Sequence, residues 1–259
     1  MGRSVRSGLP PPGFSTDASW TMIAEGIGLR RMISKILRLA GRWILALVVL
    51  SVALVLCLRW VAPPTSAFML EEQWARRLAG DRPIRYRWVD WKLISPHLPL
   101  AVVAAEDQKF PFHWGFDVAS IKKAIETNSK RQLPRGASTI TQQVAKNLFL
   151  WSGRSYFRKG LEAYFTILLE ALWPKSRILE VYVNIAEFGD GVFGAQAAAT
   201  TLLGKTPARL TRDDAALLAA VLPNPKELDV TRPSRYVLER RQWIKVQAVR
   251  LGGPGYLKD

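Results

Sequence analysis

An uninterrupted apolar segment near the N-terminus most constrains how this chain can fold. Residues 43–58 (WILALVVLSVALVLCL) carry no charge, and the apolar run resumes at residues 60–62, after Arg59. This run alone is short for a hydrocarbon core about 30 Å thick, but the Arg59 side chain can reach the interface and lengthen the usable span. We therefore predict a transmembrane helix over residues 43–62, ended by Pro63–Pro64.

Basic residues crowd the N-terminal side of this predicted helix. Residues 1–42 contain seven basic and two acidic side chains, and the positive-inside rule places this basic tail in the cytoplasm. We expect disorder to about Leu29, where glycine, serine and proline are frequent and periodicity is weak. A cleaved signal peptide is the alternative, but the length of the apolar run favours a retained, single-pass anchor.

The charge and the scarcity of cysteine and histidine limit the available chemistry. The net charge is +16, and the segments on both sides of the predicted helix are basic. Because no zinc-ligand or RNA-binding motif accompanies this charge, we expect membrane lipids and pyrophosphate groups as partners, and no nucleic acid. Cys57 is the only cysteine, and His97 and His113 are the only histidines, which excludes an intrachain disulfide, thiol catalysis and a multi-histidine metal site.

Helical periodicity dominates the remainder of the chain. Residues 63–87 form a juxtamembrane linker in which tryptophan and arginine are typical of a membrane surface, and residues 88–259 form one domain. Trp88 and Trp91 fit either that surface or the domain core. No strand ladder is evident, so the fold class is all-α. The predicted helices cover residues 98–110, 117–130, 138–150, 157–173, 175–188, 213–222 and 233–251.

Polar side chains gather on the central helix of this domain. Residues 135–147 (RGASTITQQVAKN) contain the helix, which Ser138 can cap. Spacings of i, i+3, i+4 and i+7 bring hydroxyl, amide and ammonium groups onto one face, which an apolar core would not accommodate. The four residues are Thr139, Gln142, Gln143 and Lys146.

A second block, residues 106–113 (EDQKFPFH), offers a candidate base. Glu106 ends an apolar helix, where partial burial would raise its pKa and suit it to proton abstraction near neutral pH. Asp107 is expected to stay charged in a wetter position. His113 is as readily a structural residue as a catalytic one, and Phe110 is expected to pack and fix the loop that presents Glu106.

A third block, residues 158–162 (RKGLE), adds cations. Together with Lys146, the side chains of Arg158 and Lys159 suit phosphate oxygens. Glu162 follows Arg158 by four residues, so an ordinary salt bridge on one helix face is the structural alternative. Pyrophosphate recognition beside acid–base chemistry is the combination that the three blocks indicate.

These blocks resemble, in this order, the glycosyltransferase family that polymerises peptidoglycan glycan strands, which includes the transglycosylase domains of class A penicillin-binding proteins. The resemblance continues through residues 175–184 and 188–194 and covers about residues 88–225. It is strongest to the stand-alone members, and we expect no transpeptidase activity: the chain stops at Asp259, and the Ser-x-x-Lys match at residues 120–123 is a chance one without the later motifs.

The resemblance implies a lysozyme-like fold in a periplasmic domain, anchored in the inner membrane. It further implies polymerisation of lipid II onto a growing glycan strand through β-1,4 linkages, with release of undecaprenyl pyrophosphate. Magnesium is a family expectation, no organic cofactor is expected, and cell-wall synthesis or division proteins are the expected protein partners.

The resemblance also implies roles for individual residues. Glu106 would take the proton of the acceptor hydroxyl, and Glu162 would order the cations or a metal; both are predicted as catalytic. The predicted substrate-binding residues are Asp107, Phe110, His113, Thr139, Gln142, Gln143, Lys146, Asn147, Arg158, Lys159 and Asn184.

Two other functions fit parts of this pattern. A membrane-bound lytic muramidase would share the fold and a glutamate, but it would cut the polymer and would not need the cation-rich second and third blocks. A catalytically idle scaffold, held in a cell-wall synthesis complex by the transmembrane helix, would tolerate loss of Glu106.

Overall fold

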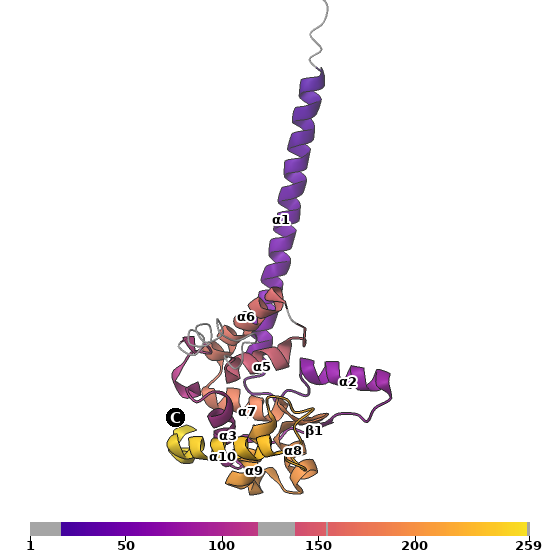
Figure 1. Ribbon diagram of the computed structural model, residues 1–259. Helices are drawn as coiled ribbons and strands as arrows, with labels where there is room; N and C mark the ends of the chain where they lie inside the picture. The colour runs from indigo at the N-terminus through magenta and orange to yellow at the C-terminus, as the bar shows by residue number, and fades with distance from the viewer. Residues whose placement is uncertain (1–16, 119–137, 154, 258–259) are drawn as a thin grey trace, which may run out of the picture. The chain divides into compact units, whose positions relative to one another are not determined.

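The computed structural model describes residues 17–118, 138–153 and 155–257 (Figure 1). Of residues 17–31, 33 and 34 it describes the backbone alone. The chain divides into two compact units, residues 1–53 and residues 54–259. The helix predicted for residues 117–130 lies almost entirely outside the described residues.

The described residues of the N-terminal unit belong to one long helix, α1 (Asp17–Cys57), which continues past residue 53 into the second unit. Its Lys35–Cys57 stretch is long and apolar enough to cross a membrane. The helix extends further toward the N-terminus than expected, so the prediction of disorder to Leu29 is wrong from Asp17 onward. Once a helix is nucleated, each added residue gains a hydrogen bond at little cost, which favours this extension.

The second unit is mainly helical, which confirms the predicted fold class. The α-helices among its described residues are α2 (Ala67–Ala79), α3 (His97–Glu106), α5 (Ile140–Phe149), α6 (Tyr156–Leu172), α7 (Lys175–Ile185), α8 (Gly194–Leu203), α9 (Arg212–Val221) and α10 (Arg235–Arg250). Short 3₁₀ helices cover Trp91–Leu93, Phe110–Phe112, Pro207–Arg209 and Gly253–Leu257.

Helix α3 lies at the centre of this unit. Leu98, Val102 and Val103 are fully buried, and the helix contacts α7, α9 and α10. Helix α5 packs on α6 and α7. An apolar helix of this kind must be covered on all sides, so its C-terminal residue, Glu106, is carried into the interior of the unit.

A small sheet departs from the all-helical expectation. Strand β1 (Arg85–Tyr86) pairs in parallel with β3 (Val192–Phe193), and β2 (Glu187–Gly189) pairs with β3 antiparallel. Strands of two or three residues are too short to show the alternation by which strands are predicted.

The polypeptide leaves α1 earlier than predicted, at Cys57 rather than at Pro63–Pro64. The exposed carbonyls of a helix end need donors. The indole Nε1 of Trp173 donates to the carbonyl of Val55 (2.7 Å), and Nη2 of Arg177 donates to that of Leu58 (2.8 Å). Side chains at the junction of α6 and α7 therefore donate the hydrogen bonds that solvent or a capping residue provides at other helix ends.

Helix α2 occupies most of the predicted juxtamembrane linker. Leu70, Trp74 and Leu78 recur every four residues and are all more than half exposed, so the helix presents an apolar stripe, as expected for a segment near a membrane surface. Trp88 and Trp91 are instead half-buried against the core. For these two tryptophans the core alternative is therefore confirmed.

Gly194 is expected to be indispensable to stability. Its φ is +80°, and a Cβ atom would lie 2.3 Å from the carbonyl oxygen of Asn184. Replacement by alanine would add left-handed strain to this backbone clash, and we expect a loss of about 2 kcal/mol or more in the free energy of unfolding. Thermal unfolding measures the effect, with Gly160→Ala as control because its Cβ would meet no atom within 4 Å. Equal stability of the two variants would contradict the prediction.

Candidate active site

The carboxylate of Glu106 is held at the end of α3 by side chains from α5 and α10, and a side chain from α7 orients the one on α5. Nε2 of Gln143 on α5 donates to Oε2 of Glu106 (3.0 Å), and Nη2 of Arg240 on α10 lies 3.5 Å from Oε1. The hydroxyl of Tyr182 on α7 donates to the Gln143 carbonyl oxygen (3.0 Å). Because this oxygen is taken, the Gln143 amide is oriented with its NH₂ group toward Glu106.

Burial raises the pKa of Glu106, and the charge of Asp107 raises it further. The hydrogen bond from Gln143 and the charge of Arg240 act in the opposite direction without cancelling the effect of burial. A carboxylate with a raised pKa holds a proton more firmly, which suits it to accept one from a hydroxyl near neutral pH. The position and surroundings of Glu106 agree with the predicted base.

Asp107 anchors the loop that follows Glu106. It is buried, so the expected wetter position is wrong. One oxygen accepts a hydrogen bond from Nε2 of His113 (2.9 Å), and the other accepts one from the N–H of Ile140 (3.0 Å), the first residue of α5. A carboxylate is favoured at the N-terminus of a helix by the unpaired N–H groups. Asp107 thus ties His113, in the segment that follows α3, to the first residue of α5.

Lys175 holds the same loop against α6 and α7. Its ammonium donates to the carbonyl of His113 (2.6 Å) and to Glu170 (2.8 Å), and it lies 4.6 Å from the centre of the Phe110 ring. Phe110 is itself buried. It therefore packs in the loop, as its residue type suggested, and is not exposed for the substrate contact that was also predicted.

Two of the polar residues on α5 serve the helix itself. Thr139, not the predicted Ser138, is the N-cap, and it forms a capping box with Gln142. The Thr139 hydroxyl also donates to the carbonyl of Gly115 (2.6 Å). Both side chains are buried, so they organise the site from within. Asn147, in the last turn of α5, has a buried Oδ1 without a partner among the described residues.

Cations from α5 and α6 gather around Glu162. Glu162 is buried and accepts hydrogen bonds from Nη1 of Arg158 (3.0 Å) and from the ammonium of Lys159. The salt bridge between Arg158 and Glu162, which was the structural alternative, is therefore present. Glu162 does not neutralise all of the positive charge, because two cations share this one carboxylate. About half of the Lys159 side chain is also exposed.

Lys146 interacts electrostatically both with Glu106 and with the charged group around Glu162. Burial lowers the pKa of Lys146; the charges of Arg158 and Lys159 lower it further, while Glu162 and Glu106 oppose the shift. Its ammonium lies 5.2 Å from the centre of the Phe68 ring and makes no hydrogen bond or ion pair with any described residue. A half-buried ammonium of this kind is costly unless an anion neutralises it. The site thus offers a base and an anion-binding group within electrostatic reach of each other.

Asn184 lies apart from these groups. It is fully buried, its Oδ1 accepts from the N–H of Val89 (2.9 Å), and its Nδ2 donates to the carbonyls of Val89 and Glu180. Two of these bonds hold residue 89 against α7, and the third lies within α7 itself. Its burial does not agree with the predicted substrate contact.

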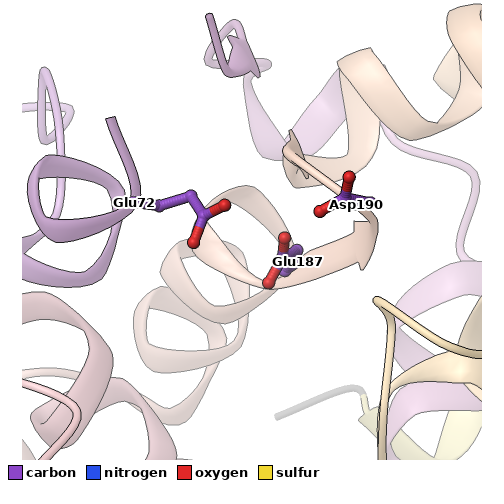
Figure 2. A group of neighbouring side chains, drawn as sticks. All are labelled: Glu72, Glu187 and Asp190. Carbon is purple, nitrogen blue, oxygen red and sulfur yellow. The ribbon is translucent and has the colours of Figure 1, made fainter. Parts of the chain in front are cut away.

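A cluster of carboxylates elsewhere has the spacing of a metal site. Glu72, Glu187 and Asp190 point toward one another from α2, β2 and the turn after β2 (Figure 2). Arg76 pairs with Glu72 and Asp190, and Lys226 pairs with Glu72 (2.6 Å). Burial acts to raise the pKa of Glu72, but hydrogen bonds from these two cations bring it below its ordinary value.

These contacts account for the cluster as an ionic link between α2 and the β2–β3 turn. Near Glu106, the described carboxylates are already engaged with Arg240, His113, Arg158 or Lys159. A magnesium site stays a prediction from the resemblance, and no step below involves that ion.

Arg240 and Tyr182 are site residues that the sequence did not single out. Arg240 belongs to a basic helix more than 130 positions from Glu106, and nothing in its spacing distinguishes it from its neighbours. Tyr182 lies in a motif that was noticed, but its hydroxyl reaches Glu106 only through Gln143.

Replacement of Arg240 by glutamine is expected to move the acidic limb of the pH–activity profile to higher pH. Arg240 holds down the pKa of Glu106; without it the pKa rises, and a base must lose its proton to act. The profile of kcat/KM measures this shift, with Arg235→Gln on the exposed side of the same helix as control. An unmoved acidic limb would show that Arg240 does not act through Glu106.

Comparison with known proteins places this geometry in context. The family described as Transglycosylase matches residues 72–249. A protein of Xanthomonas campestris pv. campestris (strain B100) is 54% identical over 224 residues, covering 84% of this chain and 91% of its own. One of Stutzerimonas stutzeri (strain A1501) is 53% identical over 230 residues, covering 88% and 94%. Each is named "Biosynthetic peptidoglycan transglycosylase".

Proposed function

The chain belongs to the transglycosylase family, and from this membership we infer that it is a peptidoglycan glycosyltransferase that uses lipid II and a glycan strand as substrates. The observation that best supports the activity is the position of Lys146, whose ammonium interacts electrostatically with both Glu106 and Glu162. A base and a cluster of cations are the two groups that transfer from a sugar pyrophosphate requires.

We propose that Glu106 accepts the proton of the 4-hydroxyl of the acceptor sugar as its oxygen attacks the anomeric carbon of the donor. The bond between that carbon and the pyrophosphate oxygen breaks, and attack from the opposite face converts an α linkage into β. Gln143 and Arg240 hold the Glu106 carboxylate in place during this step. The proton stays on Glu106 until the product leaves.

Lys146, Arg158 and Lys159 are proposed to bind the departing undecaprenyl pyrophosphate. Cations fixed at the leaving group stabilise the charge that develops there, so no acid is needed to protonate it. This requirement separates the reaction from glycoside hydrolysis, in which a carboxylic acid protonates the leaving oxygen and water attacks. Glu162 positions Arg158 and Lys159 through the ion pairs that it forms with both.

The apolar Lys35–Cys57 stretch of α1 supports a single-pass membrane anchor. We propose that the basic tail lies in the cytoplasm and that the catalytic domain lies in the periplasm at the inner membrane, because Lys35, Arg38 and Arg42 precede the apolar residues. This orientation gives the domain access to a lipid-linked donor. Binding to other cell-wall synthesis or division proteins stays a prediction.

Incubation of the purified full-length protein with lipid II tests the activity. We expect glycan strands that a muramidase digests to disaccharide units. Shortening of pre-formed glycan without polymerisation would support a lytic enzyme instead, and neither reaction, with retained binding to cell-wall synthesis proteins, would support a scaffold.

A further inference from the structure

A pocket at the opposite end of α3 from Glu106 is not used by the proposed reaction. It has a volume of about 430 Å³ and is lined by α3, α9, α10 and the C-terminal segment, elements that lie together in Figure 1. This volume is within the range of pockets that bind small molecules. The pocket begins at His97, the first residue of α3, whereas Glu106 is the last, about 13 Å farther along the helix at 1.5 Å per residue.

The walls of this pocket are apolar. Leu100 on α3 and Ile244 on α10 face it, and Val249 borders its mouth with an exposed side chain. Small residues, alanines on three helices and the glycines at positions 252 and 253, leave the space open. An occupant would therefore bury a short hydrocarbon body here.

Positive charge is concentrated at the rim. Arg212 and Lys245 both line the pocket. Asp213 pairs with Lys245 at 2.5 Å, whereas Arg212 makes no ion pair with any described residue. The rim thus retains one uncompensated guanidinium, a group that binds carboxylates through two parallel hydrogen bonds.

Two further features at the rim favour an anion. Burial and the charge of Arg212 lower the pKa of His97, so its imidazole is neutral near pH 7 and offers a hydrogen bond. Helix α3 begins beside it without a side-chain cap, and α9 begins at Arg212. The N-terminal end of α3 adds partial positive charge there, whereas that of α9 is capped by Thr211 and carries Asp213 and Asp214 in its first turn.

We propose that this pocket binds a single-chain anionic amphiphile of the fatty-acid type. The hydrocarbon chain lies between α3 and α10, and the carboxylate pairs with Arg212 at the rim. The occupant contacts α3 and α10, the two helices that carry Glu106 and Arg240.

Octanoate is a probe of suitable size. Isothermal titration of the full-length protein in phosphatidylcholine nanodiscs, corrected with empty nanodiscs, is expected to show one octanoate per chain. Octyltrimethylammonium, which has the same chain and the opposite charge, is expected to bind at least tenfold more weakly. Equal affinity for the two amphiphiles would overturn the proposal, because hydrocarbon partitioning alone would explain it.

Two variants locate the site. Arg212→Gln is expected to weaken octanoate binding about tenfold, as loss of one charge-assisted contact does, and Ala248→Trp, which fills the pocket from α10, is expected to abolish it. Arg235→Gln, on the same helix but outside the pocket, is expected to leave binding unchanged. Unaltered binding in Ala248→Trp would place octanoate elsewhere, and unaltered binding in Arg212→Gln would refute recognition of the carboxylate; either result overturns the proposal.

Discussion

Replacement of Glu106 by glutamine is expected to lower lipid II polymerisation by about 10²- to 10⁴-fold, the usual contribution of a general base. The amide has the same shape but cannot take a proton from the acceptor hydroxyl. Its carbonyl oxygen can still accept a hydrogen bond from Gln143, whose NH₂ group is oriented by Tyr182. Because burial disfavours the charged form of Glu106, a neutral amide is tolerated at this position, and we expect an unchanged melting temperature.

The matched control is Glu239→Gln, which changes an exposed carboxylate on α10, the helix that contributes Arg240. Strand formation from lipid II, followed by gel separation of the glycan, measures both variants. If Glu106→Gln kept a tenth or more of the wild-type rate, the base would lie elsewhere. Restoration of cell-wall synthesis in cells by this variant would favour the scaffold function.

The polar blocks were identifiable in the sequence because their chemistry is unusual for helices. A face with hydroxyl, amide and ammonium groups, or an acidic pair at the end of an apolar helix, does not suit a core. Those features drew attention to Glu106 and to the group formed by Lys146, Arg158 and Glu162, whose catalytic roles stay predictions. The apolar segment likewise indicated a helix able to span a membrane.

What each polar group does was harder to predict, because partners distant in the chain decide it. Thr139 and Gln142 share the polar face of α5, yet the capping box turns both toward the backbone. Asp107 follows Glu106 directly, but it reaches back to the start of α5 and is buried, while Glu106 meets Gln143. Adjacent carboxylates thus have different roles that only tertiary contacts distinguish.

Replacement of Lys146 by methionine is expected to lower polymerisation by about 10²- to 10³-fold, the cost of removing one preorganised group that stabilises transition-state charge. Methionine keeps much of the apolar stem beside the Phe68 ring, so the substitution removes chiefly the ammonium group. The remaining cations, Arg158 and Lys159, already pair with Glu162. They therefore cannot replace the ammonium of Lys146, which pairs with no described carboxylate.

The pH dependence of Lys146→Arg separates this role from packing. Burial lowers the pKa of Lys146, so wild-type kcat/KM should fall at alkaline pH earlier than an ordinary lysine would cause, because the group must be protonated to bind pyrophosphate. An arginine stays charged, and the alkaline limb should move to higher pH even if the maximal rate is reduced. Lys92→Met, at an exposed position, controls for the loss of one positive charge. An alkaline limb that stayed in place in Lys146→Arg would mean that another group sets it, and full activity of Lys146→Met would remove Lys146 from the pyrophosphate site.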